Sequence, residues 1–216
     1  MSDTHHALLV IDLQNDFCPG GSLAVQGAHH IVGPINQRIL TSNCVILTQD
    51  WHPTDHSSFA NQHAQQDPYE VIEMPYGPQV LWPDHCVMGS HGAAFHNELL
   101  VDRADLIIRK GFRQHIDSYS AFFENDRTTP TGLEGYLQTR KIEHLTIVGL
   151  ATDFCVQYSA LDAKQLGFNV TVDLNLCRGI DINNSLNEAI TAMRSCGVIV
   201  SPATHLQQHH ISKPAQ

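Results

Sequence analysis

The chain has 216 residues, 42% of them hydrophobic and 16% charged, and its formal net charge is −10 at pH 7. The acidic balance argues against nucleic-acid partners and anionic membrane surfaces, and no apolar run is long enough to span a bilayer. This length suits a single domain with a large core, which we expect to cover residues 1–216 with polar tails at about 1–6 and 205–216. The first residues lack a basic and apolar leader segment, so we expect a cytoplasmic protein.

Short apolar runs alternate with helix-like patterns along the chain. The apolar runs predict buried strands at 7–11, 44–47, 106–108, 145–148, 169–172 and 198–200. Apolar residues at helical spacing predict helices at 29–40, 133–139, 155–166 and 183–194. This alternation predicts an α/β fold with a mainly parallel sheet covered by helices. The stretches 51–94 and 112–131 read as long irregular loops, and loops of such length are usually functional.

Chemically active side chains stand at the carboxyl ends of four predicted strands. Asp12 follows the first strand, Asp50 the second, Lys110 the third, and Cys155 lies on a strand-to-helix turn after the fourth. Ligands of parallel α/β sheets bind beyond this edge. A cation lowers the pKa of a thiol, a carboxylate accepts its proton, and a helix N-terminus stabilises the thiolate. Taken singly, Cys155 could be a core residue, Asp12 a cap and Lys110 a solvated strand end, but their joint position favours a nucleophilic site.

A second constellation starts at Asp50. Asp50 and His52 are two residues apart, so in an extended segment their side chains point the same way. A carboxylate with imidazoles is a ligand set for a divalent transition metal such as Zn, Fe or Mn. His85, in a loop that begins with Trp82 and Pro83, offers a third ligand. Asp-x-His alone often arises by chance, so a metal site depends on these residues meeting.

These motifs occur in a fixed order along the chain. They are the segments 10–23, 50–53 with His56 and 58–59, 82–87, 110–111 and 151–156. Together they resemble the nicotinamidase/pyrazinamidase family of isochorismatase-like cysteine hydrolases, over nearly the whole chain from Leu8 to about Val200. Each motif alone is weak, but five in order make the resemblance specific. It implies a doubly wound α/β fold with helices on both faces of the sheet.

The resemblance also implies an activity. It is the hydrolysis of nicotinamide to nicotinate and ammonia through a thioester, in the salvage of pyridine nucleotides for NAD biosynthesis, with pyrazinamide a second substrate by analogy. By resemblance, Asp12 is the base, Lys110 the cationic activator and Cys155 the nucleophile. The oxyanion would be bound by the backbone N–H groups of Ala151 and Cys155, with a cis peptide between Leu150 and Ala151.

The same resemblance implies one divalent metal ion, zinc, iron or manganese, on Asp50, His52 and His85. The fourth position would be taken by His56, by Ser58 or by water. The metal is expected to hold the pyridine nitrogen, directly or through a bound water. Aromatic side chains are expected to bind the ring, with core packing as the alternative: Phe17 and Trp82 on its faces and Tyr119 at the border.

Two other functions stay open from the sequence. Another amidase of the superfamily, acting on carbamoyl or ureido substrates, would share the triad but lack the Asp-x-His and His metal set. A metal-binding redox sensor would use Cys155 as an oxidisable thiol. The loops 61–81 and 111–119 are longer than in short family members, which leaves the pocket rim open. Neither the identity of the metal nor the assembly of the chain, as a monomer or a homo-oligomer, follows from the sequence.

Overall fold

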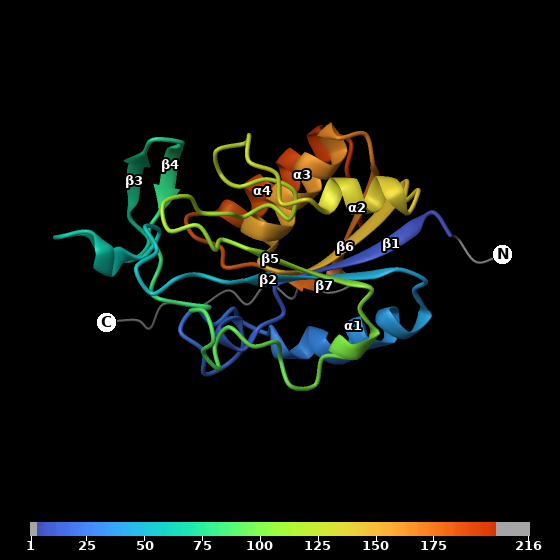
Figure 1. Ribbon diagram of the computed structural model, residues 1–216, viewed down its shortest axis with the longest axis horizontal. Coiled ribbons are helices and arrows are strands. Elements are labelled where there is room, and N and C mark those ends of the chain that lie inside the picture. Colours follow the sequence, from blue (N-terminus) through green and yellow to red (C-terminus); the bar gives the residue numbers. More distant parts are fainter. Residues whose placement is uncertain (1–3, 202–216) are drawn as a thin grey trace, which may run out of the picture.

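The computed structural model describes residues 4–201 and builds them around one six-stranded parallel sheet (Figure 1). The strand order is β5-β2-β1-β6-β7-β8, and every neighbouring pair is parallel. The strands are β1 (His6–Ile11), β2 (Val45–Asp50), β5 (Leu106–Lys110), β6 (His144–Leu150), β7 (Asn169–Arg178) and β8 (Ile199–Ser201). All six strands predicted from apolar runs are confirmed.

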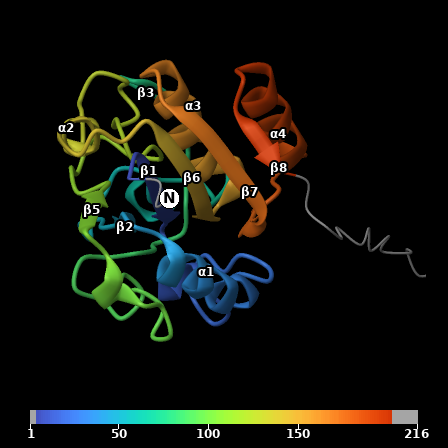
Figure 2. The same cartoon turned by 90° about the vertical axis from the view of Figure 1, so that its right-hand side faces the viewer.

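Helices cover both faces of this sheet, which confirms the doubly wound fold. In Figure 1 and the turned view in Figure 2, α1 (His29–Thr41) lies on one face of the sheet. The other face is covered by α2 (Leu133–Thr139), α3 (Gln157–Gln165) and α4 (Ser185–Ser195). Single 3-10 turns lie at Asn15–Phe17, Ala60–Gln62 and Val101–Arg103. Within residues 4–201, no helix has both the length and the apolar character needed to cross a membrane.

The order of the strands decides where a ligand can bind. Strands β1, β2 and β6 are almost fully buried because helices pack on both sides. Strand β5 at the edge alternates between half-buried and exposed residues and ends at the buried Lys110. From β1 the chain adds β2 and β5 on one side, then returns to place β6 on the other. The order therefore reverses beside β1, and the carboxyl ends of β1 and β6 flank the crevice that this reversal opens.

Three details differ from the sequence prediction. The helix expected from residue 155 is preceded by a π-helical turn, Thr152–Val156, and α3 begins only at Gln157. The stretch 51–94 is not wholly irregular, because it contains the antiparallel hairpin β3 (Val71–Met74) and β4 (Gly77–Val80). Strand β1 begins at His6, which we placed in the polar tail, while the tail expected at 205–216 lies outside the described residues.

The second long stretch, 112–131, forms no helix or strand and encloses a buried carboxylate. Glu124 is 2% exposed, its Oε1 lies 3.5 Å from Nη1 of the half-exposed Arg113, and within residues 4–201 its Oε2 has no hydrogen-bond partner. Burial raises the pKa of Glu124 from 4.5 to about 7, although Arg113 acts in the opposite direction. The charged form therefore destabilises the fold near neutral pH.

We expect Glu124→Gln to stabilise the protein at pH 8 and to have little effect at pH 4. Because the folded-state pKa lies above the unfolded one, the wild-type carboxyl contributes its stability below about pH 4.5 and loses it as the pH rises through about 7. The gain in unfolding free energy at pH 8 should be about 1–3 kcal/mol. Urea denaturation from pH 4 to 8 measures it, with the exposed Glu73→Gln as control. A difference that does not change with pH would contradict this account.

Candidate active site

Three side chains predicted from strand ends meet at the crevice beside β1. The ammonium of Lys110, at the end of β5, lies 2.8 Å from Oδ2 of Asp12 and 3.4 Å from Sγ of Cys155. It also donates to Oδ1 of Asp50 and, at 3.0 Å, to the carbonyl of Ser118. Lys110 and Asp12 are fully buried, and Cys155 is 7% exposed. A base, a cation and a thiol therefore share one site that is almost closed to water.

The charged groups of this site shift one another's pKa values. Burial alone would lower the pKa of Lys110, but Asp12 and Asp50 raise it well above its ordinary value, so the ammonium stays charged. Burial would raise the pKa of Asp50, but Lys110 and His52 hold it well below its usual range. For Asp12 burial outweighs Lys110 and raises the pKa, which makes this carboxylate a stronger base than an exposed one.

Burial favours the protonated form of the Cys155 thiol in the free site. Burial raises the pKa of Cys155 well above 9.0, and Lys110 opposes this without reversing it, because Asp12 and Asp50 add to the effect of burial. The expectation of a thiolate stabilised by a helix N-terminus is therefore wrong for the free site. The arrangement instead requires that a base take the proton as the sulfur reacts, and Asp12 is the carboxylate placed for this.

Backbone and side-chain contacts hold the two reacting groups. The hydroxyl of Thr48 donates to Oδ1 of Asp12 at 2.6 Å, which orients the carboxylate. On β6, Gly149 has φ +114° and no room for a side chain, because a Cβ there would lie 2.2 Å from the carbonyl oxygen of Ile11. This close approach of β6 to β1 brings the turn that carries Cys155 next to Asp12.

The turn after β6 has the backbone expected from the resemblance. The peptide between Leu150 and Ala151 is cis, and the N–H groups of Phe154 and Val156 both donate to the carbonyl of Ala151 at 3.1 Å. Ala151 and Cys155 line the same pocket. The role of their own N–H groups in binding an oxyanion stays a prediction.

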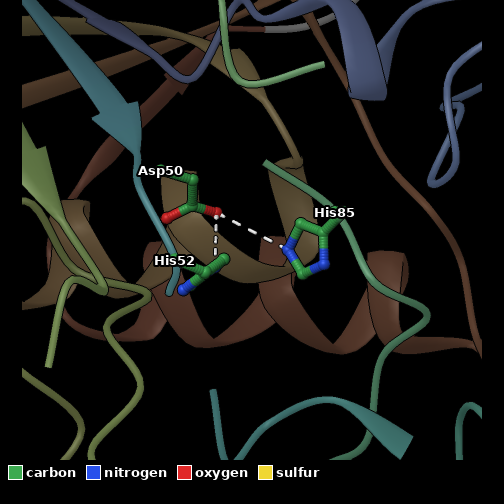
Figure 3. A group of neighbouring side chains, drawn as sticks. All are labelled: Asp50, His52 and His85. Carbon is green, nitrogen blue, oxygen red and sulfur yellow. Dashed lines mark ion pairs between the residues drawn. The ribbon is translucent and has the colours of Figure 1, made fainter. Parts of the chain in front are cut away.

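The second constellation also comes together, as Figure 3 shows. Nε2 of His52 lies 3.7 Å from Oδ2 of Asp50, and Nε2 of His85 lies 3.8 Å from the same oxygen. The other ring nitrogens donate to carbonyls, Nδ1 of His52 to Gly111 at 2.8 Å and Nδ1 of His85 to Pro83 at 2.9 Å. These bonds turn both Nε2 atoms toward the carboxylate.

The donor set fits a divalent metal. One ligand atom from each of Asp50, His52 and His85 lies within 4.8 Å of the others, and all three side chains are buried. Burial and the neighbouring His52 lower the pKa of His85 to about 4, which favours the neutral imidazole that a ligand needs. Burial would lower the pKa of His52 too, but Asp50 outweighs burial and raises it, so His52 would release a proton on binding a metal. A buried carboxylate between two imidazoles is a site for zinc, iron or manganese.

His56 lies beside this group but faces another way. Its Nδ1 is 2.7 Å from the hydroxyl of Ser58, and its Nε2 donates to the carbonyl of Ile116 at 3.3 Å. Its ring centroid is 4.3 Å from that of His52, and it forms a separate cluster with His52 and Asp117. In this arrangement both ring nitrogens already have protein partners, so a metal role for His56 or Ser58 stays a prediction that needs their side chains to turn.

The predicted ring-binding aromatics line the pocket in front of Cys155. Phe17, Trp82 and Tyr119 are buried there together with Asp50 and His85. Four further wall residues were not predicted from the sequence: Leu23, Asp117, Phe154 and Ile180. Leu23 and Phe154 lie in the motif segments 10–23 and 151–156, whereas Asp117 and Ile180 come from segments with no recognisable motif.

Asp153 is a further residue that the sequence analysis did not single out. Its carboxylate accepts hydrogen bonds from the N–H groups of Ile180 and Asp181, at 3.0 and 2.8 Å, and from the hydroxyl of Ser185 at 2.5 Å. These bonds fix the segment before α4 against the turn that carries Cys155. They thereby hold Ile180 on the wall of the pocket.

Comparisons with known proteins agree with this geometry. The isochorismatase domain model matches residues 6–205. The chain is 52% identical to the nicotinamidase of Acinetobacter baylyi over 192 residues, 89% of this chain and 90% of that protein. A solved nicotinamidase/pyrazinamidase of Acinetobacter baumannii is 51% identical, with a TM-score of 0.92 over 94% of this chain and 99% of that chain. The pyrazinamidase of Pyrococcus horikoshii, solved in complex with zinc, is 31% identical, with a TM-score of 0.73 over 91% and 98%.

Proposed function

The chain belongs to the isochorismatase family, and we propose that it hydrolyses nicotinamide to nicotinate and ammonia at the pocket in front of Cys155. The observation that carries the proposal is the meeting of two residue groups in one buried place. Asp12, Lys110 and Cys155 lie directly beside Asp50, His52 and His85, with Lys110 bonded to both Asp12 and Asp50. A carbamoyl or ureido amidase needs the first group only, and a redox sensor needs neither Asp12 nor Lys110 at the thiol.

In the first half of the reaction Asp12 accepts the proton of the Cys155 thiol as the sulfur attacks the amide carbon. The negative charge moves to the carbonyl oxygen, where the N–H groups of Ala151 and Cys155 stabilise it. The proton on Asp12 passes to the amide nitrogen as the carbon–nitrogen bond breaks. Ammonia leaves, and the nicotinoyl group remains on Cys155 as a thioester.

In the second half water hydrolyses this thioester. Asp12, again a carboxylate, accepts a proton from the water as its oxygen attacks the thioester carbon. The carbon–sulfur bond breaks, nicotinate forms, and the proton on Asp12 returns to the sulfur. Lys110 keeps its charge throughout, because Asp12 and Asp50 raise its pKa. The ammonium stabilises the anionic forms of both Asp12 and Cys155.

The ring is held by the pocket walls and by the group at Asp50. Phe17 and Trp82 pack on its faces, and Tyr119 borders it. Asp50, His52 and His85 would hold one divalent ion, which when bound would supply a Lewis acid for the ring nitrogen, directly or through a bound water. Pyrazinamide keeps the amide and a ring nitrogen in the same relation, so we expect it to be a substrate as well.

Ammonia and nicotinate release from nicotinamide by the purified, metal-replete protein is the experiment that tests the proposal. Equal amounts of the two products, measured by a coupled ammonia assay and by chromatography, would support it. Their absence would overturn the assignment of nicotinamide, and turnover of carbamoyl or ureido substrates would then identify the sister activity.

We expect His52→Ala to lower metal content and to raise KM for nicotinamide. His52 supplies one of three protein ligands, and losing one ligand weakens retention of the metal, so KM should rise about tenfold or more. Elemental analysis after gel filtration measures the metal, and initial rates measure KM. His144→Ala, at the amino end of β6 and far from the pocket, is the control. Full metal content in His52→Ala would contradict the ligand assignment.

The same measurement tests whether His56 is the fourth ligand, among the three candidates for this position, His56, Ser58 and water. If His56 is a ligand, His56→Ala should lose metal as His52→Ala does. If Ser58 or water fills the position, His56→Ala should keep its metal, because the ring nitrogens of His56 contact Ser58 and Ile116.

A further inference from the structure

The hairpin β3–β4 carries one fully buried polar side chain. The hairpin lies beyond the carboxyl edge of the sheet, at the end of the molecule opposite the N-terminus (Figure 1). Its residues are mostly exposed or half-buried, but Gln79 is 0% exposed. Gln79 does not line the pocket and does not contact the triad among the residues that the structure describes. Buried polar groups are nearly always hydrogen-bonded, so the buried carboxamide of Gln79 is expected to have hydrogen-bond partners.

All the polar atoms of this carboxamide are used. Its nitrogen lies 2.8 Å from Oδ2 of Asp117 and 2.9 Å from the hydroxyl oxygen of Tyr119, and its two hydrogens are shared between these and the carbonyl of Val80, also at 2.8 Å. Its oxygen accepts from the hydroxyl of Tyr76 and from Nδ2 of Asn125, both at 3.2 Å.

Two of these partners are walls of the pocket. Tyr119 and Asp117 both line it, and the Tyr119 hydroxyl also accepts a hydrogen bond from Nε1 of Trp82 at 3.1 Å. The backbone N–H of Tyr119 donates to Oδ1 of Asn125 at 3.0 Å, so Asn125 links the Tyr119 backbone to the same carboxamide. Gln79 thus donates directly to Tyr119 and is linked to Trp82 through the Tyr119 hydroxyl.

We propose that Gln79 is a positioning residue that sets the affinity of the pocket for the aromatic ring, by fixing Tyr119, and through it Trp82, from the surface hairpin. This inference rests on the proposed function, because it assigns Gln79 a part in binding the nicotinamide ring. Gln79 contacts none of Asp12, Lys110 or Cys155, so it acts on ring binding and not on the bond-making steps.

Gln79→Met tests this, because methionine keeps the length of the side chain and removes every hydrogen bond. We expect KM for nicotinamide to rise about tenfold while kcat stays within about twofold, since the walls loosen and the triad is untouched. The dissociation constant of nicotinamide, measured by calorimetry in a Cys155→Ala background, should rise by the same factor. Gln66→Met, at an exposed position of the loop 61–81 that contains the hairpin, is the matched control and should change neither quantity.

A purely structural role for Gln79 predicts a different result. The melting temperature would fall while KM of the folded protein stays as in the wild type, and that outcome overturns the proposal. A fall in kcat at unchanged KM overturns it as well. Wild-type turnover of nicotinamide is measured in the same series, so either failure leaves the proposed function standing.

A double-mutant cycle with Tyr119→Phe shows whether Tyr119 transmits the effect. Tyr119→Phe removes the hydroxyl to which Gln79 and Trp82 both donate. In this background Gln79→Met should raise the dissociation constant by about threefold or less, because residues that act through one contact are not additive. Additive changes in the two variants would overturn the assignment.

Discussion

Replacing Cys155 by alanine is expected to lower kcat for nicotinamide by at least about 10⁴-fold, because the covalent route through the thioester is lost. Binding should survive, since the ring contacts come from Phe17, Trp82, Tyr119 and the group at Asp50. Asp12→Asn is a second variant that stops the reaction and leaves the pocket walls in place. Calorimetry should therefore give dissociation constants of nicotinamide for Cys155→Ala and Asp12→Asn that agree within about threefold.

A matched control separates the nucleophile from the effect of losing a buried cysteine. Cys177 is 3% exposed on β7, and burial raises its pKa to about 12, so it is an inert core thiol. Cys177→Ala should lower the melting temperature and leave kcat unchanged. Mass spectrometry of wild-type protein quenched during turnover should find the nicotinoyl adduct on Cys155. Turnover by Cys155→Ala at the wild-type rate would contradict the covalent mechanism.

The sequence predicted the part of the site that depends on strand ends. Continuous apolar runs mark buried parallel strands, and the residue after each run must lie at one edge of the sheet. That is why Asp12, Asp50, Lys110 and the turn to Cys155 could be brought together before any coordinates. Gly149 lets β6 approach β1, but the need for a glycine there follows from the position of the neighbouring strand, which the sequence does not show.

The parts that were missed depend on contacts between distant irregular segments. Gln79 meets Tyr119 across 40 residues, and Asp153 meets Ile180 across 27, through hydrogen bonds that leave no periodic pattern in the sequence. The thiol pKa was predicted in the wrong direction for a similar reason. The cation Lys110 is readable from the sequence, whereas the burial that outweighs it is a property of the assembled pocket.

Lys110→Met is expected to damage both stability and activity, because it leaves the carboxylates of Asp12 and Asp50 buried beside each other without a cation. Removing one partner of a buried ion pair costs about 3–5 kcal/mol in unfolding free energy, and here one ammonium serves two carboxylates. Lys164 on α3 is half-buried, so its charge is still in contact with solvent, and Lys164→Met should cost less than about 1 kcal/mol. Urea denaturation at pH 7 compares the two.

The pH dependence of this loss tests its electrostatic origin. Without Lys110, the folded-state pKa of Asp12, which burial already raises, rises further, and Asp50 loses the cation that lowers its pKa. The protonated carboxyls then favour the fold, and the charged ones oppose it. The stability deficit of Lys110→Met should therefore shrink as the pH falls from 7 toward 4, whereas a packing defect would cost the same at every pH. In the folded fraction kcat should still fall by about 10³-fold or more, because neither the thiolate nor the charged Asp12 keeps its counter-ion. A folded Lys110→Met with wild-type kcat would remove Lys110 from the mechanism and leave it a structural cation.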